Sequence, residues 1–452
     1  MTQQEEIKLP KGWVEAPLEE IAKWGAGGTP KRSETSYYGG DIPWVKTGDL
    51  GPRRLKVASE HITELGVKNS SAKLFTKGSV AIAMYGATIG KTSILDFDAT
   101  TNQACAVGQP IADVTDTEFL YYILKNEKQN FIDKGKGGAQ PNISQQIIKA
   151  HTIGFPPHPE QKRIVEKLDS VLAQVDTIQQ RLNNLPDIIK RFRQSVLAAA
   201  VSGKLTEQWR DSSDIAQWKQ VKLGDVGKGF NYGSSTKSEK EGRVPVLRMG
   251  NIQSGKLDWE KLVYTSDPDE IKKYKLNKYD VVFNRTNSPE LVGKTAIYLG
   301  EKESIFAGYL IRVQGSERLD ALFLNFLLNS PKARAYCREV KTDGVSQSNI
   351  NAQKLKALEF NLPPMTEQTE IVRLVEQYFA LADTLEKNLA NAKQRVDNLT
   401  QSILAKAFRG ELVPQDPNDE PADKLLARIK AARLEAEKLE KAAKKAAKAS
   451  KK

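Results

Sequence analysis

The sequence predicts an α/β protein in which two pseudo-symmetric mixed α/β domains alternate with two long helices that pair as an antiparallel coiled coil, followed by a C-terminal helical tail. Three observations predict this fold. A segment of about fifty residues occurs twice at a fixed offset, and its apolar residues follow coiled-coil spacing. The stretch before each copy also repeats, with weaker identity.

The repeated segment covers residues 156–205 and returns at residues 363–412, so the offset is 207 and no residue is gained or lost. Each copy opens with Pro-Pro, continues into Glu-Gln and closes with Gly-x-Leu. Between these landmarks the apolar residues step by four and three, which keeps one helix edge against a partner helix. The apolar positions are Ile164, Leu168, Val171, Val175, Ile178, Leu182, Leu185, Ile189, Phe192 and Val196, then Ile371, Val375, Tyr378, Ala382, Leu385, Leu389, Ala392, Val396, Leu399 and Ile403.

Both copies begin and end as helices do. Glu160 and Glu367 lie in the expected first turn, where an acid favours the positive end of the helix dipole. Gly203 and Gly410 stand where a left-handed residue ends a helix. Pro186 interrupts the first copy and is expected to kink it, because proline removes a backbone donor.

The segments before the helices are predicted to be mixed α/β. The expected elements of the first are a strand and helix from Trp13 to Ile21, strands at 42–45 and 80–84, and a helix at 116–128. Trp218 matches Trp13 at an offset of 205, and residues 293–295 match residues 90–92 at 203. Because this offset drifts, the two domains have diverged in their loops. The predicted boundaries are 1–155 and 211–362 for the domains, 156–210 and 363–414 for the helices, and 415–452 for the tail.

Composition favours a polyanionic partner. The chain has 452 residues and a formal net charge of +12, which is typical of proteins that bind nucleic acid or an anionic surface. Two cysteines give no disulfide framework, the histidines and cysteines show no zinc spacing, and no apolar run is long enough to cross a bilayer. We therefore expect a soluble cytoplasmic protein without a metal site.

The tail is the most basic part of the chain. Residues 421–452 hold 11 basic and 4 acidic side chains, and their apolar residues again step by four and three. This pattern predicts a helix with one apolar edge. Its basic face is either a solvated helix end or a contact for phosphate or a partner protein.

Two Gly-Lys-Thr turns, at residues 90–92 and 293–295, invite a phosphate-loop interpretation. That motif needs an earlier glycine, where Tyr85 and Ser288 stand, and a following helix, where strands are expected. These departures argue against nucleotide binding, and we expect Lys91 and Lys294 in turns between strands. Each lysine lies near a DNA phosphate or is simply exposed.

Further polar residues sit at matching places in both repeats. Gln and Asn can pair bidentately with adenine, Arg with guanine, and all can bond to phosphate. The alternative for the asparagines is a helix N-cap, with Asn142 or Ser144 capping the helix that follows. The candidate DNA contacts are Lys46, Thr47, Tyr85, Lys91, Gln140, Asn142, Arg248, Asn251, Arg285, Asn287, Lys294, Gln347 and Asn349.

Catalytic signatures are missing from the sequence. The two Pro-Pro pairs do not form the Asn/Asp-Pro-Pro-Tyr/Phe motif of adenine amino methylation, and no Gly-x-Ser-x-Gly motif or nuclease carboxylate cluster is found. We expect no catalytic residue and no cofactor in this chain.

Taken in order, these motifs resemble the specificity (S) subunit of type I restriction–modification enzymes. The resemblance rests on Gly12-Trp13, the Gln-x-Asn-Ile loops at Gln140 and Gln347, the two Pro-Pro-x-x-Glu-Gln helix starts and the two Gly-x-Leu helix ends. It implies two target-recognition domains, each recognising one half of a bipartite, asymmetric site on double-stranded DNA. It also implies two methyltransferase (M) subunits that use S-adenosylmethionine, and restriction/translocase (R) subunits that use ATP and Mg2+.

Three other readings of the residues remain open at this stage, one of which is an enzyme that uses the lysine turns on a nucleotide. The chain could be a coiled-coil scaffold that binds proteins rather than DNA. It could also serve a methylation-only or phage-exclusion system that has no nuclease subunit.

Overall fold

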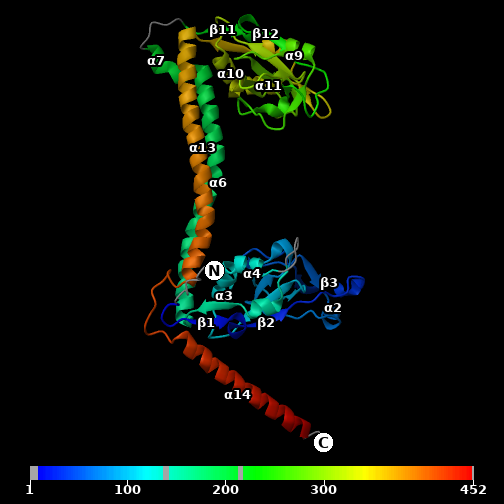
Figure 1. Ribbon diagram of the computed structural model, residues 1–452, viewed down its shortest axis with the longest axis vertical. Coiled ribbons are helices and arrows are strands. Elements are labelled where there is room, and N and C mark those ends of the chain that lie inside the picture. Colours follow the sequence, from blue (N-terminus) through cyan, green and yellow to red (C-terminus); the bar gives the residue numbers. More distant parts are fainter. Residues whose placement is uncertain (1–8, 136–141, 212–216, 450–452) are drawn as a thin grey trace. The chain divides into compact units, whose positions relative to one another are not determined.

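The computed structural model describes residues 9–135, 142–211 and 217–449 (Figure 1). The chain forms two compact units. The first contains residues up to 180 and from 393 onward, and the second contains residues 181–392. Each unit therefore combines one α/β domain with part of both long helices.

The first domain is built from short strands and helices. Its elements are β1 Val14–Pro17, α1 Leu18–Ile21, β2 Ala22–Ala26, η1 Thr35–Tyr37, β3 Tyr38–Val45, β4 Arg54–Leu55, β5 Glu60–Ile62, α2 Glu64–Lys68, β6 Val80–Ala83, η2 Gly86–Thr88, β7 Thr92–Leu95, β8 Thr100–Thr101, β9 Cys105–Pro110, α3 Thr117–Asn126, α4 Lys128–Asp133, α5 Gln145–Lys149 and β10 Thr152–Phe155. Strands pair in the orders β2-β9-β6-β7-β4, β5-β3-β8 and β1-β10. The predicted strands at 42–45 and 80–84 and the helix near 116–128 are confirmed as β3, β6 and α3.

The second domain repeats this plan. Its elements are β11 Lys219–Lys222, α8 Leu223–Val226, β12 Lys228–Tyr232, β13 Val244–Leu247, η4 Met249–Asn251, β14 Ile252–Gln253, β15 Lys256–Leu257, β16 Val263–Thr265, α9 Pro268–Tyr274, β17 Val281–Asn284, β18 Thr286–Asn287, β19 Thr295–Ile297, β20 Ile305–Phe306, β21 Leu310–Gln314, α10 Ala321–Asn329, α11 Pro331–Val340, β22 Thr342–Asp343, β23 Ser348–Asn349, α12 Ala352–Lys356 and β24 Glu359–Leu362. The orders β12-β21-β17-β19, β16-β13-β20 and β11-β24 match those of the first domain, except that the largest sheet has no strand equivalent to β4. The sheets β14-β15 and β18-β23-β22 are added.

The long helices are α6, His158–Ser202, and α13, Met365–Phe408. Within the second unit Ile189 packs with Ala382 and Leu389, and Arg193 donates to Asp383 at 2.6 Å. Within the first unit Gln179 donates to Asp397 at 3.1 Å. Residue numbers rise along one helix as they fall along the other, so the predicted antiparallel pairing is confirmed.

The contact between the two long helices buries only part of the apolar edge that the sequence predicts for each of them. Val175, Ile189, Val196, Ala382 and Val396 are buried. Other positions of the same predicted seam keep about two-fifths of their surface exposed, namely Ile178, Tyr378, Leu385 and Leu399. Because a single partner helix covers only a narrow strip, alternate positions of the seam face outward in this two-helix pair.

The ends of the long helices follow the sequence prediction. Gly203 has φ +79° and Gly410 has φ +72°, the left-handed conformation that favours glycine. After α13 the Glu411 N–H donates to the Lys406 carbonyl at 2.9 Å, as in a Schellman cap. Pro186 is exposed and lies inside an unbroken α6, so proline does not divide this helix.

The glutamate of each Glu-Gln pair has a structural role that the helix-dipole argument missed. Glu160 and Glu367 are fully buried. Trp13 Nε1 donates to Glu160 at 3.1 Å, and Trp218 Nε1 donates to Glu367 at 2.8 Å. The carboxylates also receive bonds from the chain beyond the opposite helix, through Gln415 at 3.2 Å and Arg210 at 2.7 Å respectively. Each glutamate therefore joins the start of one long helix, a domain tryptophan and the end of the other helix.

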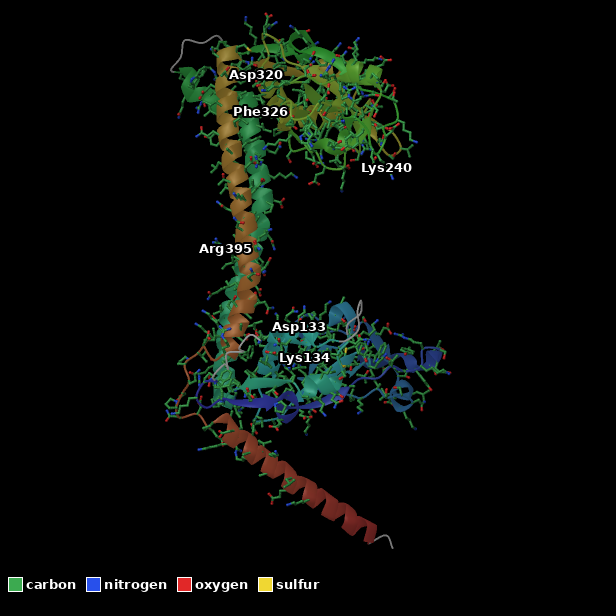
Figure 2. The ribbon with its side chains drawn as sticks, in the orientation of Figure 1. Asp133, Lys134, Lys240, Asp320, Phe326 and Arg395 are labelled. Carbon is green, nitrogen blue, oxygen red and sulfur yellow. The ribbon has the colours of Figure 1, made fainter. Side chains whose placement is uncertain are left out.

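The glutamine that follows attaches the domain itself. Gln161 Oε1 accepts from the backbone N–H of Asp116 at 2.9 Å, and Gln368 Oε1 accepts from that of Asp320 at 2.8 Å. Asp320 is labelled in Figure 2. Asp116 and Asp320 are the N-caps of α3 and α10. Phe119 of α3 packs on Phe408 of α13 at 5.5 Å between ring centres. The Glu-Gln pair thus attaches α3 of the first domain to the start of α6, and α10 of the second domain to the start of α13.

The two buried glutamates differ in charge balance. Burial opposes ionisation of Glu367, but the hydrogen bonds from Arg210, Thr206 and Trp218 outweigh it and lower its pKa. Burial raises the pKa of Glu160, and the bonds from Gln415 and Trp13 offset only part of this effect. One carboxylate oxygen of Glu160 is buried without a hydrogen-bond partner.

We predict that Glu367→Ala destabilises the second unit by about 3–5 kcal/mol, because it leaves the Arg210 charge and the Trp218 donor unpaired. Hydrogen exchange in peptides from residues 203–211 and from the first turns of α13 measures this effect. Glu376→Ala on the exposed side of α13 is the matched control and should change little. Equal protection in Glu367→Ala and the wild type would contradict the assigned role.

Candidate nucleic-acid interface

Two segments distant in sequence meet beside the central strand β17 of the second domain. The chain leaves β17 into β18, which pairs with β23 so that Thr286 faces Asn349 and Asn287 faces Ser348. β22 and β23 form a short hairpin, and Gly344 donates to the Gln347 carbonyl at 2.8 Å across its turn. The fold therefore brings together the candidates Arg285, Asn287, Gln347 and Asn349.

Arg285 is held in place by its neighbours. Its guanidinium lies 4.6 Å from the centre of the Tyr232 ring and donates to the Gly308 carbonyl at 3.3 Å and to Asn349 Oδ1 at 3.4 Å. Asn349 in turn donates to Thr286 at 2.8 Å. Such stacking and hydrogen bonding orient the planar donor fork before any ligand arrives. Arg285 Nε remains buried without a partner.

The rest of this surface is exposed. Gln347 is exposed, and neighbouring Val345 is fully exposed at the tip of the hairpin. Asn287 is half-buried, and its Oδ1 accepts from the Ser288 N–H at 2.8 Å, which leaves its NH2 group available. Exposed amides on a hairpin can reach base edges or phosphates.

The first domain has the same arrangement in simpler form. Tyr85 follows β6 and forms an isolated β-bridge with Asn142, and the Ile143 N–H donates to the Met84 carbonyl at 3.0 Å. Tyr85 is 42% exposed. Gln140 lies outside the described residues.

The predicted helix cap at Asn142 or Ser144 is confirmed at Ser144, whereas neither Asn142 nor Asn349 is a cap. Ser144 caps α5 by accepting from the Ile147 N–H, and Asn351 caps α12 by accepting from the Lys354 N–H. Asn142 and Asn349 lie two residues earlier, in the bridges just described. Their side chains therefore are not used as caps.

Both lysine turns close the loops that connect antiparallel strands, β6 to β7 and β17 to β19. Gly90 has φ +75° and Gly293 has φ +83°, and the chain continues into β7 and β19 rather than a helix. Lys91 is exposed. Lys294 is half-buried and donates to Gln253 at 3.3 Å, and burial together with the charge of Arg334 lowers its pKa.

The remaining candidates lie in the loops after β3 and β13. Lys46 binds Glu60 at 2.6 Å, so its charge is already paired. Asn251 is buried, and its side chain accepts from the Arg248 N–H and donates to the carbonyls of Asp258 and Glu260 at 3.0 and 3.1 Å. All hydrogen-bonding groups of Asn251 thus hold its own loop. Arg248 and Thr47 are half-buried.

The sequence argument missed two tyrosines of this surface. Tyr232 supports Arg285, and its hydroxyl accepts from the Ala352 N–H at 3.0 Å. Tyr309 is 46% exposed, and its carbonyl accepts from the Arg285 N–H at 3.0 Å. Neither tyrosine belongs to a repeated motif, so the sequence carries no signal for their role.

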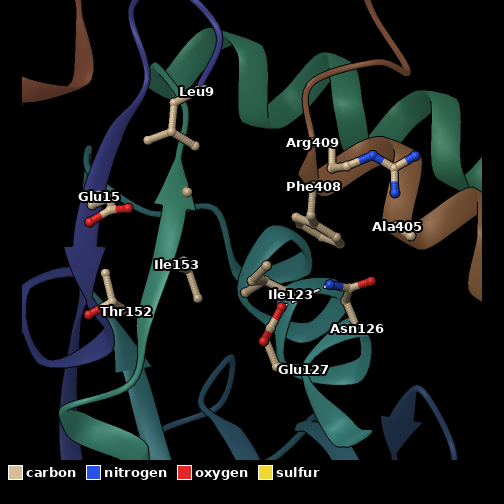
Figure 3. Close-up of a pocket in the computed structure, with 11 residues that line it drawn as sticks. Leu9, Glu15, Ile123, Asn126, Glu127, Thr152, Ile153, Ala405, Phe408 and Arg409 are labelled. Carbon is tan, nitrogen blue, oxygen red and sulfur yellow. Dashed lines mark hydrogen bonds between the residues drawn. The ribbon is translucent and has the colours of Figure 1, made fainter. Parts of the chain in front are cut away.

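A separate cleft of about 470 Å³ lies in the first unit, away from these loops (Figure 3). Ile123, Glu127, Ile153 and Phe408 line it, where α3, β10 and the end of α13 meet. Among the described residues, no group of histidine, cysteine or acidic side chains could hold a metal ion. Within the same residues, no helix is both long and apolar enough to span a membrane.

Comparison with known proteins decides the family. The model of the type I restriction modification DNA specificity domain matches residues 10–187 and again residues 216–393. The chain belongs to this family. Its two matches coincide with the two halves of the internal repeat, so it carries two DNA specificity domains.

Relatives of known name agree over nearly the full length. The chain is 34% identical to the EcoKI specificity subunit of Escherichia coli K12 and 33% identical to the StySPI specificity subunit of Salmonella potsdam. Each alignment covers 94% of this chain and 96% of the relative. The predicted function is confirmed at this level: the chain is a type I specificity subunit that recognises a DNA sequence. Specificity subunits are the non-catalytic components of these systems.

Solved structures share the fold. The HsdS subunit of Thermoanaerobacter tengcongensis aligns with a TM-score of 0.59 at 20% identity, over 91% of this chain and all of that one. A chain from a study of assembly and conformational transition in the type I R-M system aligns at 0.63 and 19% identity, over 89% of this chain and 99% of that one.

We predict that substitution of one polar residue of the second domain changes DNA binding, whereas substitution of another changes stability alone. Arg285→Ala should weaken specific DNA binding by about 1–3 kcal/mol and relax base preference in one half-site, because a pre-oriented donor fork is lost. Asn251→Ala should cost roughly 1–3 kcal/mol of stability and leave base preference unchanged, because its bonds are internal. Denaturation and the methylation pattern of the assembled enzyme separate the two. An unchanged pattern in Arg285→Ala would refute the assignment.

Proposed function

We propose that each α/β domain recognises one half of a bipartite, asymmetric DNA site. The first half is assigned to residues 1–155 and the second to residues 211–362. The observation that carries the proposal is the repeated pairing beside the central strands: Tyr85 with Asn142 in one domain, and β18 with β23 in the other. The supporting framework is equivalent in both domains, whereas the side chains on it differ.

Different residues of the candidate set then have different duties. In the second domain Arg285, Asn287, Gln347 and Asn349 contact bases, since they share one partly exposed surface. In the first domain Tyr85 and Asn142 occupy the corresponding place, and Gln140, which lies outside the described residues, is assigned to the same half-site from its sequence match to Gln347.

The loop lysines and the residues after β3 and β13 supply sequence-independent affinity or support. Lys91 and Lys294 lie on turns suited to phosphate contact, which carries salt-dependent but not base-specific binding. Lys46, Thr47 and Arg248 flank the recognition surface, and Asn251 fixes the loop of Arg248.

Membership of the specificity-subunit family supports the partners that we propose. Two methyltransferase (M) subunits bind the long helices and tail, use S-adenosylmethionine and methylate a flipped adenine in each half-site. Restriction/translocase (R) subunits add ATP- and Mg2+-dependent cleavage of unmodified DNA. This chain itself holds no cofactor, and the complex acts in the cytoplasm. The outward apolar positions of the helices, such as Leu385 at 45% exposure, support such docking.

An exchange of domains tests the proposal. When residues 211–362 are replaced by the corresponding domain of another specificity subunit, one half-site should change and the other should stay the same. Replacement of residues 1–155 is the reciprocal control and should change only the other half. Genome-wide mapping of methylated adenines reads out both. A change in both half-sites from one exchange would contradict the proposal.

A further inference from the structure

The recognition loop of the second domain, residues 285–294, rests on helix α11. It leaves β17 with Arg285 and returns through Gly293 and Lys294 into β19. Its two strand ends are closed by bonds from the Gly293 N–H to the Asn284 carbonyl at 2.7 Å and from the Asn284 N–H to the Lys294 carbonyl at 2.8 Å. Between these ends β18 pairs with β23, and the Leu291 and Val292 N–H groups donate to the Ser288 carbonyl at 3.0 Å. The carbonyls of Glu290 and Val292 are left to accept from outside the loop.

Arg334 of α11 supports the loop through these two carbonyls. Its guanidinium donates to the Val292 carbonyl at 2.8 Å and to the Glu290 carbonyl at 3.0 Å. A planar fork that holds two carbonyls of one turn fixes both their spacing and their direction. The loop also lies close against α11: a Cβ on Gly293 would be 2.8 Å from Cys337 Sγ and 3.1 Å from an Arg334 nitrogen.

The charge of Arg334 is used in an unusual way. It is half-buried, burial lowers its pKa, and it makes no salt bridge with the described acidic residues. Burial of a guanidinium costs free energy unless its N–H groups find hydrogen-bond acceptors. Here backbone carbonyls of the loop satisfy them, so the conformation of the loop and the position of Arg334 depend on each other.

The first domain supports its corresponding loop differently. There Gly90 packs against the side chain of Lys128. A Cβ added to Gly90 would lie 2.5 Å from Lys128 Cγ. Among the described residues, Lys128 makes no side-chain hydrogen bond to that loop comparable with those of Arg334. Among the described residues, the support of the loop by an arginine that binds two backbone carbonyls is therefore found in the second domain alone.

We propose that Arg334 is a positioning residue for sequence recognition by the second domain. Without touching DNA, it holds residues 285–294 so that Arg285 and Asn287 meet their bases. This inference rests on the proposed division of the DNA site between the two domains.

The test compares variants of the full chain assembled with its methyltransferase subunits. Arg334→Met removes both donors and keeps an apolar stem, and Arg338→Met is the matched control, since Arg338 is exposed one turn later on α11. Affinity is measured for duplexes carrying the wild-type methylation site and for duplexes altered in either half, over a series of salt concentrations. Hydrogen exchange in β17 and α10 reports whether the second domain stays folded.

Arg334→Met should lose about tenfold of its discrimination at the second half-site, the size of one lost base contact. Discrimination at the first half-site and the salt dependence of affinity should stay as in the wild type, and Arg338→Met should keep full discrimination. If the slope of the logarithm of affinity against the logarithm of salt concentration fell in magnitude by about one, Arg334 would be a phosphate contact, and the proposal would be overturned. Full discrimination in a folded Arg334→Met variant would overturn it too.

If β17 and α10 of the Arg334→Met variant lose protection from hydrogen exchange, the second domain is no longer folded, and the binding assay uses Arg334→Lys instead. It keeps the charge but replaces the planar fork by a single ammonium, so intermediate discrimination is expected. Undiminished discrimination in Arg334→Lys would contradict the proposal. A wild-type complex without a two-part methylation site would refute the proposed function itself, which separates that failure from a failure of the Arg334 assignment.

Discussion

The Glu-Gln pair at the start of each long helix is the interaction on which the rest of the structure depends. Both members are fully buried in both copies. The glutamate binds a tryptophan of the domain and the chain that follows the opposite helix, while the glutamine binds the backbone beside the N-cap of α3 or α10. Because a buried polar group left unpaired costs free energy, these bonds fix the domain and both helices together at each end. This explains why the offset stays at 207 between the landmarks: an insertion would move one end of a helix away from its partners.

The two ends are built alike but are not equivalent. Glu367 is matched by the charge of Arg210, whereas Glu160 has Gln415 and keeps one oxygen without a partner. Ionisation is therefore favoured at Glu367 and disfavoured at Glu160, as the opposite directions of their pKa shifts show. The recognition loops differ in the same manner, since equivalent backbone bridges carry Tyr85 and Asn142 in one domain and Thr286 and Asn349 in the other. A constant framework with variable side chains is what recognition of two unlike DNA sequences requires.

The long helices, their glycine ends and the main strands could be predicted from the sequence because each leaves a periodic or repeated signal. The role of Glu160 and Glu367 could not, since an acid in a first turn has the same sequence signature whether it faces water or is buried. The sequence left the cap open between Asn142 and Ser144, and Ser144 holds it, because both residues suit that position and only the backbone decides between them. Tyr232 and Arg334 act through contacts between segments far apart in the chain, and their positions carry no pattern. Gln140 lies outside the described residues, so its role stays a prediction.

We propose that the length of the paired helices sets the length of the unspecified DNA between the two half-sites. The most direct test inserts one heptad at facing positions in the middle of α6 and α13, which keeps the apolar edges in phase and lengthens each helix by about 10 Å. Mapping of methylated adenines in cells that carry this variant should show both half-sites unchanged, with the unspecified DNA between them longer by about three base pairs at roughly 3.4 Å each. An unchanged separation, or altered half-site sequences, would contradict the account.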